Sequence, residues 1–228
     1  MSITVARKPA KARRQGRPTI KGSVGRDALV EAARQALKTK SPAEITLAVI
    51  AQIAGVDRAL IRYYFGRLDD LLAAAAVEIT KDLRSRLASL INQRGTARSR
   101  LERRIEVYLE LFRENPNYHR LVVDHVYRYD TEDKRVVLRL LLQSVEELDD
   151  LLREGVQSGE FRAVDQRMVQ IAIGAMCEFF FSAHPVVQAI LGGAWGGSTS
   201  PPAFAQSVAT LIVGPKERGR AGARPRRA

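Results

Sequence analysis

Hydrophobic residues recur three and four positions apart along most of the chain, which is the pattern of helices that bury one face. Ahead of Pro116, for example, Leu101, Ile105, Tyr108 and Leu109 share one stripe, and the proline disfavours a helical residue before it. No alternating stretch is long enough for a convincing strand. The pattern therefore predicts an all-α protein with about nine helices, at about residues 26–40, 46–54, 57–65, 68–91, up to 114, 117–127, 132–157, 165–182 and 201–213.

Three short helices are expected in the forty residues from Arg26, and local signals mark where two of them begin and end. Thr46 is suited to cap the second helix, and Gly55 supplies the left-handed residue that would end it. Val56 follows as an apolar plug, and Asp57 is a good cap for the third helix. These are the parts of a helix-turn-helix, although an ordinary pair of packed short helices would share the glycine and the apolar positions.

The net charge of +12 is concentrated at the two ends of the chain. Residues 1–67 carry 14 basic and 4 acidic side chains, and residues 215–228 carry six and one, which leaves −3 for residues 68–214. A basic module beside a mildly acidic one is typical of proteins that bind a polyanion with one part of the molecule. We expect a basic flexible arm at 1–22, a helix-turn-helix domain at 23–67, an acidic helical domain at 68–214 and a basic disordered tail at 215–228.

Features of an enzyme, a metal protein or a membrane protein are missing from the sequence. Cys177 has no partner for an internal disulfide, three histidines form no zinc pattern, and no P-loop, GxSxG or HExxH motif occurs. The acidic residues at 146–150 are expected to form a solvated helix face. The longest apolar run, 171–195, is interrupted by Glu178, Pro185 and glycines. We therefore expect a non-enzymatic cytoplasmic protein with no cofactor, no metal and no membrane partner.

The segment at 45–65, ITLAVIAQIAGVDRALIRYYF, resembles the helix-turn-helix of the tetracycline-repressor (TetR) family. The resemblance is specific over residues 26–72, and the helices expected beyond residue 72 are compatible with the family. One further segment, EGVQSGEFRAVD at 154–165, is similar to the turn that joins the family's seventh and eighth helices. The resemblance implies a bacterial, nucleoid-associated regulator whose domain at 68–214 binds a ligand and dimerises. The matching positions are Thr46, Ile50, Ala51, Ala54, Gly55, Val56, Tyr64, Phe65, Leu71 and Leu72.

By this resemblance, the second short helix of the motif reads bases in the major groove while flanking residues hold phosphates. Three positions depart from the family pattern: Asp57 replaces a serine, Arg62 a tyrosine and Leu68 a lysine. The family's lysine contact to phosphate is therefore absent, and Arg67 is the candidate substitute. Thr46, Tyr64 and Arg67 are expected on phosphates, and Arg58, Ala59, Leu60, Arg62 and Tyr63 on bases.

The arm at 1–22 contains Arg13, Arg14 and Arg17 beside Gly16 and Pro18. This composition is similar to minor-groove hooks, in which arginines favour narrow A·T tracts. A plain phosphate-binding tail explains the same residues equally well, so both alternatives stay open. Either one implies double-stranded DNA as the partner.

The expected function is a ligand-responsive repressor that binds a pseudo-palindromic operator as a homodimer, because one short recognition helix reads too few base pairs. The helix at 165–182 is apolar nearly all round, which suggests burial on two sides and an interface shared with the last helix. The alternative is a non-specific architectural DNA-binding protein without an effector. The candidate lining for a mostly apolar effector is Tyr108, Phe112, His125, Ser144, Met176 and Phe180, with a core or surface role as the alternative for His125.

Overall fold

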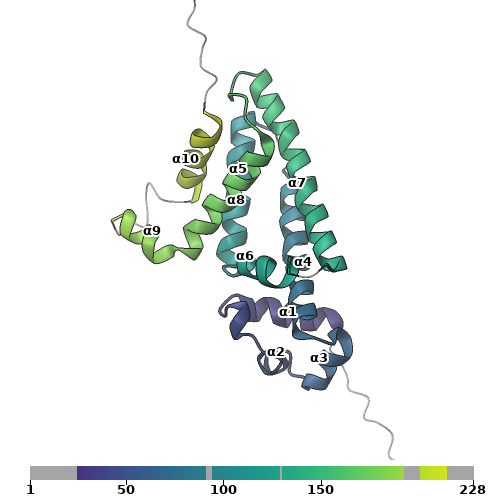
Figure 1. Ribbon diagram of the computed structural model, residues 1–228. Helices are drawn as coiled ribbons and strands as arrows, with labels where there is room; N and C mark the ends of the chain where they lie inside the picture. The colour runs from purple at the N-terminus through teal and green to yellow at the C-terminus, as the bar shows by residue number, and fades with distance from the viewer. Residues whose placement is uncertain (1–24, 91–93, 129, 193–200, 215–228) are drawn as a thin grey trace, which may run out of the picture.

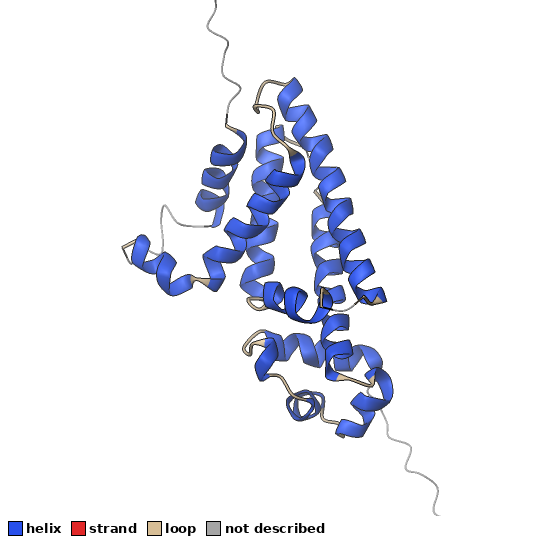
Figure 2. Cartoon of the chain, viewed as in Figure 1, coloured by secondary structure: helices blue, strands red, loops and turns tan. Residues whose placement is uncertain are grey.

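A computed structural model describes residues 25–90, 94–128, 130–192 and 201–214. Over these residues the chain consists of helices and loops and contains no strand (Figure 2). Three short helices form a small unit at one end, and a taller bundle stands on it (Figure 1). The prediction of an all-α fold with an N-terminal helix-turn-helix and a C-terminal bundle is confirmed.

The small unit consists of α1 (Arg26–Leu37), the 3₁₀ turn η1 (Pro42–Glu44), α2 (Leu47–Ala54) and α3 (Arg58–Phe65). Leu29, Ile50 and Ile61, one from each helix, are fully buried and form its centre. Helix α1 ends at Leu37, three residues before the predicted end. The three helices therefore share one small core that fixes the orientation of α3.

Helix α4 (Leu68–Ala88) starts beside α3 and continues into the bundle, so it belongs to both units (Figure 1). Residues 71–77 are all buried, and four of them are alanines at 73–76. Small side chains let neighbouring helices approach closely, and α4 packs against α1, α5 and α7. Any movement of α4 within the bundle therefore also moves its end beside α3.

The bundle is completed by α5 (Ala97–Glu114), α7 (Glu132–Gln157), α8 (Gln166–Ser182) and α10 (Pro201–Val213). Helix α5 lies centrally and packs against α4, α7, α8 and α10. Its predicted stripe, from Leu101 to Phe112, is buried. The predicted bounds of α7 are confirmed, and so is the cap of α8, where Asp165 accepts from the backbone N–H groups of Arg167 and Met168.

Two connecting segments differ from the sequence prediction. The single helix predicted at 117–127 is a short α6 (Tyr118–Leu121) followed by the π-helical turn η2 (Val122–Val126). Helix α9 (His184–Ile190) was not predicted, so the described residues hold ten α-helices rather than about nine. Pro185 was interpreted as an interruption, but proline is well tolerated in the first turn of a helix, where it stands here.

The turn between α7 and α8 explains the sequence echo at 154–165. Phe161 is fully buried, and its ring lies against the backbone of Gly155, where an added Cβ would come within 2.0 Å of the ring. The backbone N–H of Phe161 also donates to the Gly155 carbonyl (3.0 Å). Glycine at 155 is therefore required for the ring to close this end of the bundle.

Candidate nucleic-acid interface

The turn between α2 and α3 is held by the local bonds that the sequence predicts. Thr46 Oγ1 accepts from the backbone N–H of Val49 (3.3 Å), and Asp57 Oδ1 accepts from that of Ala59 (2.7 Å). Gly55 is left-handed, with φ of +65°, a value that costs glycine little. The three predicted roles, two caps and a left-handed turn, are confirmed.

Helix α3 presents one anchored face and one exposed face. Ile61 and Phe65 are buried against the small core, whereas Tyr63 is 80% exposed. The residues predicted to read bases lie on the exposed side, except that Leu60 is half-buried; they are Arg58, Ala59, Leu60, Arg62 and Tyr63. Neither Arg58 nor Arg62 makes an ion pair within the described residues, so both guanidinium groups can reach base edges, where arginine pairs bidentately with guanine.

The residues predicted to hold phosphates flank this face. Thr46 is exposed at the start of α2, and the Tyr64 ring meets the Tyr63 ring edge to face, with centroids 5.2 Å apart. Arg67 already has a partner, since its Nη2 donates to Asp69 Oδ2 (2.7 Å). A phosphate contact by Arg67 would therefore have to share that carboxylate. Arg13, Arg14 and Arg17 lie outside the described residues.

Side chains of the bundle reach the helix-turn-helix unit at two points that could not be predicted from the sequence. Asp69 Oδ1 lies 3.1 Å from His125 Nδ1 in η2, so one carboxylate joins Arg67 to His125. Asn117 Nδ2 donates to the carbonyl of Leu37, the last residue of α1 (2.9 Å), and to that of Lys40, three residues further along (3.0 Å). The segment around α6 therefore contacts both α1 and the start of α4.

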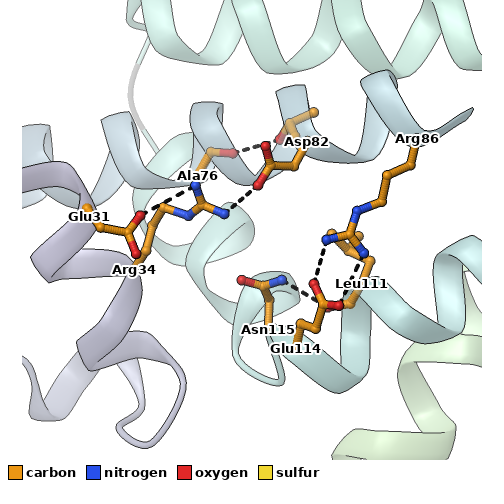
Figure 3. Close-up of polar contacts among 9 residues, drawn as sticks. Glu31, Arg34, Ala76, Asp82, Arg86, Leu111, Glu114 and Asn115 are labelled. Carbon is orange, nitrogen blue, oxygen red and sulfur yellow. Dashed lines mark hydrogen bonds and ion pairs between the residues drawn. The ribbon is translucent and has the colours of Figure 1, made fainter. Parts of the chain in front are cut away.

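Ion pairs fix α4 to its neighbours on either side (Figure 3). Arg34 of α1 pairs with Asp82 of α4, and it lies 3.6 Å from Glu31. Further along α4, Arg86 donates two bonds to Glu114 at the end of α5 (2.6 and 3.3 Å). The Arg86 guanidinium lowers the pKa of Glu114 below its usual value, because its hydrogen bonds favour the charged carboxylate. Helix α4 is thus tied to α1 and to α5 by charged pairs.

Residues 94–181 match the family model described as the tetracyclin repressor-like C-terminal domain. Residues 94–181 therefore carry a C-terminal domain of the tetracycline-repressor (TetR) type. The resemblance drawn from the N-terminal motif and the match to the C-terminal helices therefore agree. No curated protein sequence matches the chain.

Several solved structures share the fold. FadR from Bacillus subtilis in complex with stearoyl-CoA is 21% identical, with a TM-score of 0.60 over 82% of this chain and 98% of that chain. PfmR from Thermus thermophilus, a TetR family transcriptional regulator, is 20% identical, with a TM-score of 0.62 over 83% and 99%. The superantigen PfiT is 17% identical, with a TM-score of 0.62 over 82% and 95%. Because a transcriptional regulator and a superantigen share this fold, the function of this chain must be argued from its site.

The six residues predicted to line an effector site lie in different surroundings. Phe112 packs on Tyr118, Phe180 packs on Phe204, and Met176 is exposed on α8. Tyr108 and Ser144 are buried in the bundle, while His125 lies in a cavity beside Val123 and Tyr127 at the DNA-binding end. Their part in effector binding stays a prediction.

In the single chain helix α8 is buried on one side, and burial of its second side stays an expectation for an interface. Val169, Ile173 and Cys177 are buried. The opposite side leaves apolar side chains exposed, and α10 adds another; they are Met168 (64%), Ile171 (63%), Phe179 (51%) and Leu211 (69%). Within one chain the second apolar face of α8 is therefore uncovered.

The described residues offer neither a single membrane-spanning helix nor a candidate metal site. No single helix there is both long and apolar enough to cross a membrane; α8 and α9 together reach the length, but they meet at a bend of 91°. No three His, Cys, Asp or Glu side chains gather there as a candidate metal site. The single cysteine, Cys177, is buried, and burial raises the pKa of its thiol to about 12.

Proposed function

We propose that the protein is a ligand-responsive repressor that binds a pseudo-palindromic operator as a homodimer. The observation that carries this proposal is the outer face of α3, where Arg58 and Arg62 are exposed on a helix whose other face is locked into the core. A rigid helix that exposes one arginine at its first residue and a second one turn later suits base reading in the major groove. Residues 23–67 would form the DNA-binding domain and residues 68–214 the ligand-binding and dimerisation domain.

A dimer through α8 and α10 is supported by the uncovered apolar face of α8. Met168, Ile171 and Phe179 recur at helical spacing on that face, and Leu211 of α10 is also exposed. Contiguous exposed apolar side chains typically mark a protein interface. A second copy of the chain is the natural partner, because two recognition helices would then read two half-sites about 34–36 Å apart.

The effector is proposed to be a small, mostly apolar molecule bound within the bundle. FadR from Bacillus subtilis was solved with stearoyl-CoA, and from that neighbour we carry over only the idea that this fold accepts a small molecule. We place the protein in the bacterial cytoplasm at the nucleoid, where its operator would be. The alternative of an architectural DNA-binding protein is favoured by no specific feature of the described residues.

Selection from a randomised DNA pool tests the proposal directly. The full-length protein should retain duplexes that share an inverted repeat, and Arg58→Ala should weaken the enrichment of that repeat. Binding should fall with salt on all DNA but remain stronger on the selected duplex than on a scrambled one. Equal affinity for both duplexes at every salt concentration would favour the architectural alternative.

A further inference from the structure

A cavity of about 220 Å³ lies at the end of the bundle opposite α1–α3 (Figure 1). Three helices meet there: the end of α4, the first turns of α5 and the last turns of α7. Its apolar lining consists of Leu87, Leu90 and Leu151, and its charged lining consists of Arg100, Arg104, Glu147, Asp150 and Glu154. Since an engineered cavity of about 150 Å³ holds benzene, this volume suits a molecule of about nine non-hydrogen atoms.

Each carboxylate of the lining already has an arginine partner. Glu147 accepts from Arg84 of α4, with Oε1 2.6 Å from Nη2. Asp150 accepts from Arg153, one turn further along α7 (2.9 Å). Glu154 pairs with Arg100 of α5. The acidic residues of the cavity are therefore neutralised without Arg104.

Arg104 is the arginine of the cavity that lacks a carboxylate partner within the described residues. It is 5% exposed, and its Nη2 donates to the Ser144 carbonyl (2.6 Å) and lies 3.5 Å from Gln170 Oε1. Its Nε has no hydrogen-bond partner. Burial lowers the pKa of Arg104, because desolvation disfavours the charged form, yet an arginine remains protonated at neutral pH.

A buried cation without a paired carboxylate is costly, since the nearby Glu147 charge and neutral groups such as the Ser144 carbonyl replace only part of its lost hydration. A structural role accounts for part of the arrangement, because Arg104 ties α5 to the Ser144 carbonyl of α7. That role requires only one hydrogen bond to a neutral acceptor, which an uncharged side chain could supply. The charge and the remaining donors are better explained by an anion that binds beside three leucines.

We propose that this cavity binds a small apolar monocarboxylate, whose carboxylate pairs with Arg104 and whose apolar part packs on Leu87, Leu90 and Leu151. The proposal rests on the ligand-responsive half of the proposed function and names its ligand class. It also places the ligand away from four of the six residues suggested by the sequence, because only the Ser144 carbonyl and the Tyr108 side chain lie near the Arg104 charge. Because the cavity is beside the last turn of α4, an occupant would act on the helix that reaches α3.

Calorimetry on the full-length protein tests the charge requirement with matched probes. Benzoate and benzamide have the same shape and the same number of non-hydrogen atoms, and octanoate and octanamide form a second pair. We expect at least one carboxylate to bind once per chain and at least tenfold more tightly than its amide. Equal binding of acid and amide in both pairs, or no binding of either carboxylate, would overturn the proposal.

Variants locate the site. Arg104→Met should weaken carboxylate binding at least tenfold, whereas Arg103→Met should leave it unchanged, because Arg103 donates to the Arg94 carbonyl outside the cavity. Leu151→Phe should also abolish binding by filling the space while keeping Arg104. Carboxylate binding that survives both Arg104→Met and Leu151→Phe would place the site elsewhere and overturn the assignment.

The ligand-free melting temperature separates this site from a purely structural arginine. If the Arg104 charge serves to bind an anion, the Arg104→Met protein should have a melting temperature no lower than that of the wild type. Added carboxylate should then raise the melting temperature of the wild type but not that of the variant. A lower melting temperature without any carboxylate effect on the wild type would make Arg104 structural. Enrichment of operator DNA by the ligand-free protein is independent of these results, so either proposal can fail without the other.

Discussion

Substituting Gly155 by alanine tests whether the α7–α8 turn is packed as described. In an exposed helix interior this change stabilises by about 1 kcal/mol, because alanine is the better helix former. Here the new Cβ would stand 2.0 Å from Phe161 Cδ2 and 2.3 Å from Cε2, far inside contact distance. The ring is fully buried, so it cannot move away without leaving a cavity.

The expected magnitude follows from what the ring contributes. Displacing a buried phenylalanine costs about 3–5 kcal/mol, so Gly155→Ala should lower the free energy of unfolding by roughly 2–4 kcal/mol after the gain in helix propensity. Phe161→Ala alone should cost about 3–5 kcal/mol. Once the ring is gone the clash is gone too, so adding Gly155→Ala to Phe161→Ala should be neutral or stabilising by up to about 1 kcal/mol.

Urea unfolding of the four proteins at one fixed protein concentration measures this cycle, because a dimer's apparent stability depends on concentration. The two single changes should be strongly non-additive, as expected for residues in direct contact. Additive effects, or a Gly155→Ala protein more stable than the wild type, would show that the ring does not lie against the glycine.

Four further outcomes are expected. Arg58→Ala or Arg62→Ala should cost about 1–3 kcal/mol on the selected operator and relax base choice, as measured by fluorescence anisotropy on matched and scrambled duplexes. Replacing the three arm arginines should weaken binding to all DNA and flatten its salt dependence, whereas a loss confined to A·T-flanked operators would favour the minor-groove hook. Phe179→Glu on the uncovered face of α8 should give a folded monomer by light scattering, and a persistent dimer would argue against that interface. Arg86 lowers the pKa of Glu114, so the charged carboxylate stabilises the fold above its unfolded pKa of about 4.3 and this contribution is lost as the pH falls. Glu114→Gln should therefore lower the free energy of unfolding by at most about 1 kcal/mol at pH 7, and by progressively less in acid.

The helix-turn-helix could be predicted from the sequence because its determinants are local. Thr46 and Asp57 each accept a backbone hydrogen bond from a residue two or three positions away, and Gly55 needs only its own φ angle. The bounds of α7 were predictable for the same reason, since its apolar period and its Thr131 cap are both local. Helix α9 was missed because Pro185 fits both a helix start and an interruption.

The contacts that join the two units could not be predicted, since they depend on how distant segments pack. Asn117 reaches the carbonyl of Leu37, 80 residues earlier, and nothing in an Asn-Pro-Asn turn specifies that acceptor. His125 was a candidate for an effector site or for a core or surface role, and its contact with Asp69 depends on how η2 packs beside the start of α4. The burial of Arg104 could not be predicted from a segment rich in arginine, because it depends on the packing of α5 against α7.

These contacts suggest how events in the bundle can reach DNA without touching the recognition helix. Helix α4 lines the Arg104 cavity with its last turn, while Asp69 in its first turn contacts both Arg67 and His125. A ligand can move α4 only if it binds the displaced form more tightly than the DNA-bound form. Linkage then requires operator DNA to weaken ligand binding by the same factor. Because a second copy would hold its recognition helix about 34–36 Å away, a shift of a few ångströms at α3 would be enough to lose one half-site.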